Sequence, residues 1–147
     1  MGRYYLDTSA LVKLYVQEPG TDRLLPLVDR LDNRFAVLAI SIVEIRSAIR
    51  RRQRAGDIDA SVATAVLDSV RSHMETRFIR QMINEIVIDA ALEMIDRYIL
   101  RACDAVQLAG CLVLGATVAE AYTFVCSDHR LLEAAQSEQL SVLDPAA

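Results

Sequence analysis

Short apolar runs alternate with longer amphipathic stretches along this chain, and that alternation limits the folds it can adopt. The apolar runs are short enough for buried strands and lie at 4–6, 35–40, 78–82, 123–126 and 141–143. The intervening spacing predicts helices over 10–16, from 21 onward, and over 41–55, 59–74, 84–98, 104–115 and 131–135. Strands and helices in this order indicate an α/β sandwich with a mostly parallel sheet.

Length and composition indicate the domain size and the cellular compartment of the protein. The chain has 147 residues, 53% of them hydrophobic, which is enough for a single domain (1–147) with one core. No uninterrupted apolar run reaches the roughly 18 residues of a membrane helix, and no signal region precedes the first strand. Cys103, Cys111 and Cys126 stand in apolar runs, which is typical of buried free thiols. We therefore expect a cytoplasmic protein that does not enter the membrane.

Four carboxylates stand just after strand-like runs or in the first turn of a helix. They are Asp7, Glu44, Asp104 and Asp128. A carboxylate beside a core is unfavourable unless something pairs with it, and the chain has a single lysine, Lys13. Because the carboxyl ends of parallel strands share one edge of a sheet, we expect the four acids to meet there. Such a cluster is a site for a hard divalent cation.

Each acid also has a purely structural interpretation. Asp7, Asp104 and Asp128 are favoured types for helix N-caps. Ser41-x-x-Glu44 fits the capping box, in which the glutamate reaches back to the serine backbone. No single acid decides between the two interpretations, but four with the same strand-edge placement favour a shared site.

The helical periodicity also predicts which side chains face the core. The expected inward residues are Leu24, Leu25, Leu27 and Val28; Ile42, Ile45, Ala48 and Ile49; Val62, Val66, Leu67 and Val70; and Ile88, Ala91, Leu92 and Ile95. The helix expected from Ser41 carries an arginine cluster on its other side: Arg46, Arg50, Arg51, Arg52 and Arg54. The net charge of −4 argues against a protein that coats nucleic acid. The cluster fits either a local phosphate contact or a solvated helix face.

Four segments, taken in order, resemble the PIN-domain family, and in particular its VapC-type toxins. They are Tyr5-Leu6-Asp7-Thr8-Ser9-Ala10-Leu11-Val12-Lys13-Leu14-Tyr15, Ser41-Ile42-Val43-Glu44-Ile45-Arg46-Ser47-Ala48, Leu100-Arg101-Ala102-Cys103-Asp104-Ala105-Val106-Gln107-Leu108-Ala109, and Phe124-Val125-Cys126-Ser127-Asp128-His129-Arg130-Leu131-Leu132 with Leu140-Ser141-Val142-Leu143. Each segment is short, but the ordered set spans nearly the whole chain. The resemblance implies a PIN-like three-layer α/β/α sandwich.

The resemblance also implies a function. The four acids would hold Mg²⁺, for which Mn²⁺ substitutes, and the protein would be an endoribonuclease that hydrolyses RNA phosphodiesters. Asp7 and Asp104 would be direct ligands, and Glu44 and Asp128 direct or water-mediated ones, with Asp128 alternatively orienting the nucleophile. The expected contacts to the RNA backbone, the acids or the phosphate are Arg46, Arg50, Arg51, Thr8, Ser9 and Ser127.

A toxin further implies an antitoxin protein as partner, and a homodimer. Leu11, Leu14, Tyr15, Ile45 and Ile49 are candidates for the antitoxin groove, but ordinary core packing is the interpretation we favour for them. Two other function classes compete. One is a catalytically idle PIN-like interaction module, and the other is a phospho-acceptor receiver domain, which the lack of paired acids after the first strand disfavours.

Overall fold

A five-stranded parallel sheet forms the centre of the molecule. The computed structural model describes all residues, 1–147, and the strand order is β3-β2-β1-β4-β5. Every neighbouring pair is parallel. The strands are β1 Arg3–Leu6, β2 Arg34–Leu38, β3 Phe78–Gln81, β4 Thr123–Val125 and β5 Val142–Leu143. The helices are α1 Thr8–Val12, α2 Thr21–Asp29, α3 Ser41–Arg54, α4 Ala60–Thr76, α5 Glu85–Arg97, α6 Ala102–Val118 and α7 His129–Ser137.

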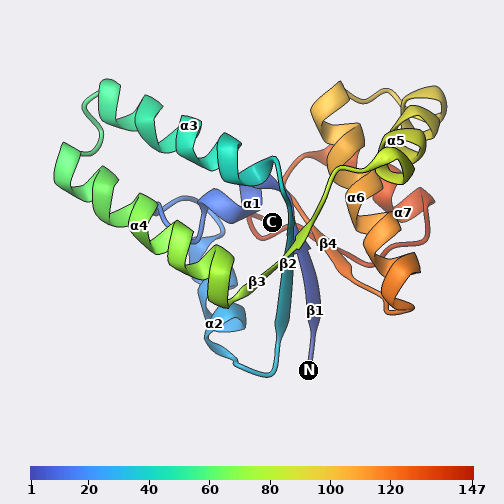
Figure 1. Ribbon diagram of the computed structural model, residues 1–147, viewed down its shortest axis with the longest axis horizontal. Helices are drawn as coiled ribbons and strands as arrows, with labels where there is room; N and C mark the ends of the chain where they lie inside the picture. Colours follow the sequence, from blue (N-terminus) through green and yellow to red (C-terminus); the bar gives the residue numbers. More distant parts are fainter.

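Helices cover both faces of this sheet, so the predicted three-layer α/β/α sandwich is confirmed. Figure 1 shows α3 and α4 as a helical pair on one side, and α5, α6 and α7 on the other. Side chains alternate along the strands, and neighbours point into different cores. Tyr5 packs in the core under α5 to α7, whereas Leu6 packs in the core under α1 to α4.

The connections create a switch in direction beside β1. The chain moves from β1 outward to β2 and β3, with α1 to α4 on one face. It then returns through α5 and α6 on the other face to β4 and β5, on the far side of β1. In open parallel sheets such a point leaves a crevice outside the carboxyl ends of the strands, which is where ligands bind. Asp7 directly follows β1, Asp128 follows β4 and begins α7, and Glu44 lies in the first turn of α3, the helix that follows β2.

Two helices end where the sequence pattern did not predict. The helix expected over 10–16 stops at Val12, because the Thr21 hydroxyl donates to the carbonyl oxygens of Lys13 (2.8 Å) and Val16 (3.2 Å). The helix expected to close at Gly115 continues to Val118 and ends with Ala119 in the left-handed region, φ 53°. Gly115 lies within the helix, and its carbonyl accepts the Glu120 N–H. A Cβ atom at this position would lie 3.1 Å from the Glu120 carbonyl oxygen, so the lack of a side chain lets the chain after α6 pass close by.

The predicted inner faces are partly wrong. On α5, Ile88, Leu92 and Ile95 are exposed by 43%, 59% and 41%, while the buried residues are Val87, Ala91 and Met94. Apolar residues of α5 lie on most sides of the helix, so the periodicity alone did not identify the buried side. That side contains the small Ala91, which lets α5 pack closely against α6. The other residues predicted to be buried but found exposed are Leu25, Val62 and Cys103.

The remaining core predictions are confirmed. Ile45 and Ile49 are fully buried, as is Leu11, in agreement with core packing rather than an open groove. Cys111 and Cys126 are buried and all three cysteines are free. No helix in the structure combines the length and the apolar character needed to cross a membrane.

Gly110 on α6 lies against the sheet at a point of very close contact. A Cβ atom added there would overlap the Tyr5 hydroxyl and lie 2.7 Å from Leu38 Cδ1. We expect Gly110→Ala to lower the free energy of unfolding by about 1–3 kcal/mol, because overpacking outweighs the better helix propensity of alanine. The Tyr5 hydroxyl is buried without a hydrogen-bond partner, so Tyr5→Phe should be neutral or stabilising and should partly relieve Gly110→Ala. Urea unfolding of the two single variants and the double variant measures both effects. A Gly110→Ala protein as stable as wild type contradicts the packing.

Candidate metal centre

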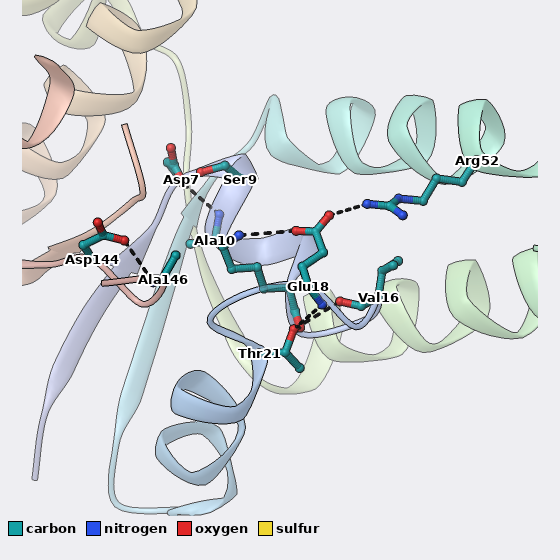
Figure 2. A network of polar contacts seen from close by, with 10 residues as sticks. Asp7, Ser9, Ala10, Val16, Glu18, Thr21, Arg52, Asp144 and Ala146 are labelled. Carbon is teal, nitrogen blue, oxygen red and sulfur yellow. Dashed lines mark hydrogen bonds and ion pairs between the residues drawn. The ribbon is translucent and has the colours of Figure 1, made fainter. Parts of the chain in front are cut away.

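Asp7 directly follows β1 and begins α1. Its Oδ1 accepts the Ala10 backbone N–H (2.9 Å) and the Ser9 hydroxyl (2.7 Å), as Figure 2 shows. Its own N–H donates to the Val125 carbonyl, which fixes Asp7 between β1 and β4. The predicted N-cap is thus confirmed, yet the side chain is only 6% exposed and Oδ2 makes no hydrogen bond.

Burial of this carboxylate has an electrostatic consequence. It raises the pKa of Asp7 from the ordinary 3.8 to about 6, although the Ala10 and Ser9 hydrogen bonds act in the other direction. The negative charges of Asp104 and Glu44 raise the pKa further. Asp7 therefore lies close to both of these acids and is poorly compensated by protein groups, which is typical of a functional carboxylate.

Glu44 does not form the predicted capping box. The N-cap of α3 is Ile40, without a side-chain cap. Glu44 Oε1 instead accepts the Thr8 hydroxyl at 2.7 Å, and Glu44 Oε2 makes no hydrogen bond. Glu44 therefore bonds to Thr8 at the start of α1 and not to the Ser41 backbone. The interpretation of Glu44 as a helix cap is thus excluded.

A buried polar network holds this contact in place. Gln107 on α6 is 4% exposed, and its Nε2 donates to Ser41 Oγ (2.9 Å) and Thr8 Oγ1 (3.1 Å) and lies 3.4 Å from Glu44 Oε1. Ser41 Oγ lies 2.9 Å from Thr8 Oγ1. The carbonyl oxygen of Gln107 is buried without a partner, so the amide acts entirely through its N–H groups. The network joins the starts of α1, α3 and α6, the three helices whose first turns or caps supply Asp7, Glu44 and Asp104.

The sequence pattern did not predict Ser41 and Gln107 as site residues. A signal for Gln107 was present, because it is a polar interruption of the apolar stretch 105–119 and follows Asp104 by three residues on one helix face. Ser41 was noticed only as a candidate cap.

Asp104 is the third residue of α6, not its cap. The N-cap is Arg101, without a side-chain cap, so the predicted cap role is wrong. Burial raises the pKa of Asp104, as does the charge of Asp128, while Arg101 lowers the pKa and Glu44 raises it. The Arg101 Nε atom lies 3.8 Å from Asp104 Oδ2, and the Arg101 side chain is 87% exposed.

Asp128 is the N-cap of α7, as predicted. Its Oδ1 accepts the Leu131 N–H at 3.0 Å, and its Oδ2 makes no hydrogen bond. The side chain is exposed and, with Asp104, lines a hollow of about 330 Å³. Three of the four acids thus share one arrangement: one oxygen is fixed by a protein donor and the other is available.

The four carboxylates gather at one edge of the sheet without forming a closed cage. Each carboxylate interacts electrostatically with at least one other. The charges of Asp104 and Glu44 raise the pKa of Asp7, and the charges of Asp128 and Glu44 raise the pKa of Asp104. No group of three or more His, Cys, Asp or Glu side chains is drawn together tightly enough to hold an ion by itself. An open set of carboxylate oxygens suits a hydrated hard cation, which needs only one or two direct carboxylates and retains several waters.

The sequence profile of a known family agrees with this geometry. The profile described as "PIN domain" matches residues 4–137, a span that includes all four acids. This chain belongs to the PIN-domain family. Ribonuclease VapC35 of Mycobacterium tuberculosis, from two strains, is 34% identical over 142 residues, which cover 96% of this PIN protein and 96% of the relative.

Solved structures share the PIN fold along almost the whole chain. A toxin–antitoxin complex from Klebsiella pneumoniae matches with a TM-score of 0.65 at 14% identity, covering 97% of each chain. VapBC2 from Rickettsia felis, solved with a DNA fragment from its promoter, matches with a TM-score of 0.65 at 14% identity, covering 95% of this chain and 96% of that one. At such identities the likeness concerns the fold alone.

The predicted RNA contacts of this PIN domain divide into two groups. Thr8, Ser9 and Arg51 line a hollow of about 860 Å³ that Glu44 also lines. Arg46 lies elsewhere, in a smaller hollow between α3 and α4, and Arg50 is half-buried and donates to Gln53.

The three predicted hydroxyl contacts differ as well. The Thr8 hydroxyl donates to Glu44 and the Ser9 hydroxyl donates to Asp7, as expected. The Ser127 hydroxyl is buried without a partner and does not contact an acid.

Proposed function

We propose that this PIN protein is a metal-dependent endoribonuclease of the VapC type, the toxin of a toxin–antitoxin pair, acting on RNA in the cytoplasm. The observation that carries the proposal is the gathering of Asp7, Glu44, Asp104 and Asp128 at the carboxyl edge of the sheet, with the pKa values of Asp7 and Asp104 raised. The likeness to Ribonuclease VapC35 supports RNA as the substrate.

The metal we assign to this edge is Mg²⁺, for which Mn²⁺ substitutes. All donors are carboxylate oxygens, the ligands these ions prefer. Asp7 and Asp104 are the proposed direct ligands, because a raised pKa marks a carboxylate that lacks a compensating cation. Glu44 and Asp128 act directly or through water.

The chemistry is hydrolysis of a phosphodiester. A Mg²⁺ ion held by these carboxylates would make a bound water molecule more acidic and would stabilise the charge that develops on the phosphate. The Ser9 hydroxyl donates to Asp7 Oδ1, and the Thr8 hydroxyl donates to Glu44 Oε1. These hydrogen bonds fix the orientation of both carboxylates and leave Asp7 Oδ2 and Glu44 Oε2 available to bind the metal ion. The alternative role that we propose for Asp128 is to orient the nucleophile, since its Oδ1 caps α7 and its Oδ2 makes no hydrogen bond.

The proposed partners follow from the same family. A toxin needs an antitoxin protein, and solved relatives include a toxin–antitoxin complex. We also propose a homodimer, which the exposed apolar side chains of α5 support. A catalytically idle interaction module remains the second candidate, and an activity assay separates the two.

The test is cleavage of a mixed pool of structured RNAs by the purified chain, freed of any bound protein. We expect discrete fragments with Mg²⁺ or Mn²⁺ and none with EDTA. Asp104→Asn should slow cleavage more than about a hundredfold, since even the outer partners of metal ligands are worth 10–100-fold. Asp68→Asn, which removes an exposed acid of α4 that lines neither hollow, is the matched control and should cleave normally. Fragments that persist in EDTA contradict the metal mechanism, and folded protein that cuts nothing favours the interaction module.

A further inference from the structure

Two hollows are lined by three of the four acids, and one residue is common to both. The larger, of about 860 Å³, runs along α1 and a stripe of α3 that includes Glu44, Arg51 and Arg52. The smaller, of about 330 Å³, contains Asp104, Asp128 and Arg130. Arg101 lines both, so the hollows meet at its side chain, directly beside Asp104.

The larger hollow is lined by four cationic side chains, Lys13, Arg51, Arg52 and Arg101, and by three acidic ones, Glu18, Glu44 and Asp57. Lys13, which is 8% exposed, lies 3.4 Å from Glu18, and the same carboxylate pairs with the Arg52 guanidinium (Figure 2). Two cations thus share one anion. The pairing also holds the guanidinium in place, so Arg52 loses little freedom when it binds an anion. A phosphate oxygen is the ligand that a preorganised guanidinium suits best.

Neither hollow is lined by an aromatic side chain. Base stacking, the main sequence-tolerant contact to single strands, is therefore absent from this surface. What remains is contact between arginine side chains and phosphates, which positions a nucleic acid without reading its bases.

Arg101 is free to take part in such contacts. Its separation of 3.8 Å from Asp104 and its 87% exposure make the ion pair weak. The guanidinium can therefore turn from the carboxylate to a phosphate without a large loss.

We propose that one RNA strand runs with its backbone along the joined hollows and that arginines bind it on both sides of the cleaved bond. Arg51 and Arg52 bind phosphates on one side, Arg130 binds on the other, and Arg101 binds the phosphate next to the acids. This track rests on the proposed function for its choice of RNA as ligand. It adds Arg101 and Arg130, which lie outside the arginine cluster of α3, to the residues that bind the sugar–phosphate backbone.

The first test measures equilibrium binding of a fluorescent single-stranded RNA in EDTA over a range of salt concentrations. Each lost phosphate contact should lower the slope of log K against log salt by about 0.7. We expect that drop, with binding weakened severalfold, for Arg101→Gln, Arg52→Gln and Arg130→Gln. Arg54→Gln is the matched control, because it removes the same charge from α3 but lines neither hollow, and it should leave the slope unchanged. Circular dichroism melts confirm that every variant is folded.

The second test asks whether the contacts lie on opposite sides of the cut. Once the cleavage site in an RNA is known, the RNA is shortened from one end or the other and binding is measured again. Removing the nucleotides on one side should abolish the loss caused by Arg52→Gln and leave that of Arg130→Gln intact, and the other truncation should do the reverse. If one truncation abolishes both losses, or if Arg101→Gln binds like Arg54→Gln, the track is wrong. Because binding is measured without metal, a protein that binds along the track but never cleaves RNA overturns the proposed function alone.

Discussion

Replacing Asp7 with asparagine is expected to stop RNA cleavage and, at the same time, to make the metal-free protein more stable at pH 7.5. An asparagine side chain still accepts the Ala10 N–H, so the cap of α1 survives. The charge of Asp7, in contrast, is destabilising in the folded protein, since burial raises its pKa from 3.8 to about 6. Such a shift corresponds to about 3 kcal/mol at most, and we expect a gain of about 1–3 kcal/mol.

The raised pKa of Asp7 determines how the stability difference between the two proteins changes with pH. A folded-state pKa above the unfolded value means that the folded protein binds the Asp7 proton more tightly. The stabilising contribution of that proton is fully present below about pH 4 and is lost as the pH rises through about 6. The advantage of Asp7→Asn over wild type should therefore be small at pH 4.5 and complete at pH 7.5.

Urea unfolding in EDTA at the two pH values measures this difference. Saturating Mg²⁺ should then stabilise the wild-type protein more than the variant, because only the wild type retains the full ligand set. An Asp7→Asn protein that is less stable than wild type at pH 7.5, or a difference that does not change with pH, contradicts the assignment of a buried, uncompensated carboxylate.

Replacing Gln107 with leucine is expected to damage the site without touching any of the four acids. The change leaves Ser41, which is fully buried, without the amide donor, and removes the link between α6 and the Thr8–Glu44 pair. We expect a loss of about 1–3 kcal/mol in stability. Groups that orient metal ligands are typically worth 10–100-fold in affinity or activity, so cleavage should fall by about that factor. The concentration of Mg²⁺ at half-maximal rate should rise as well.

Leu108→Ala is the control for a general loss of stability. Leu108 is the next residue on α6 and is fully buried, but it takes no part in the polar network. Its truncation should cost about 2–5 kcal/mol, as much as Gln107→Leu or more. Well below both melting temperatures, Leu108→Ala should cleave RNA at nearly the wild-type rate. If both variants lose activity in proportion to stability, Gln107 has no positioning role.

The sequence predicted the architecture because its signals there are local. Short apolar runs and the polar residues after them identified all five strands, including β3, and placed Asp7 and Asp128 at strand ends. It predicted α5 less well, since Ile88, Leu92 and Ile95 are as apolar as the residues that α6 covers. Which face of such a helix is buried depends on its neighbour, and no local pattern contains that information.

The candidate site was predicted in its members but not in its connections. Glu44 fits a local capping box, yet in the folded protein its oxygen bonds to Thr8, far away in the chain. Gln107 is anchored to residues of two other helices, so its role emerges only once α1, α3 and α6 are brought together. The same holds for Arg101, whose position between two hollows is a property of the assembled edge.

The central claim is that the four acids form one metal site, and binding of Mn²⁺ measured by electron paramagnetic resonance tests it most directly. The proteins to compare are the wild type and Asp7→Asn, Glu44→Gln, Asp104→Asn, Asp128→Asn and the control Asp68→Asn. We expect saturable binding by the wild type and the control, and weaker binding by all four site variants, most of all those at Asp7 and Asp104. A wild-type protein that binds no Mn²⁺, or site variants that bind it as tightly as wild type, contradicts the account.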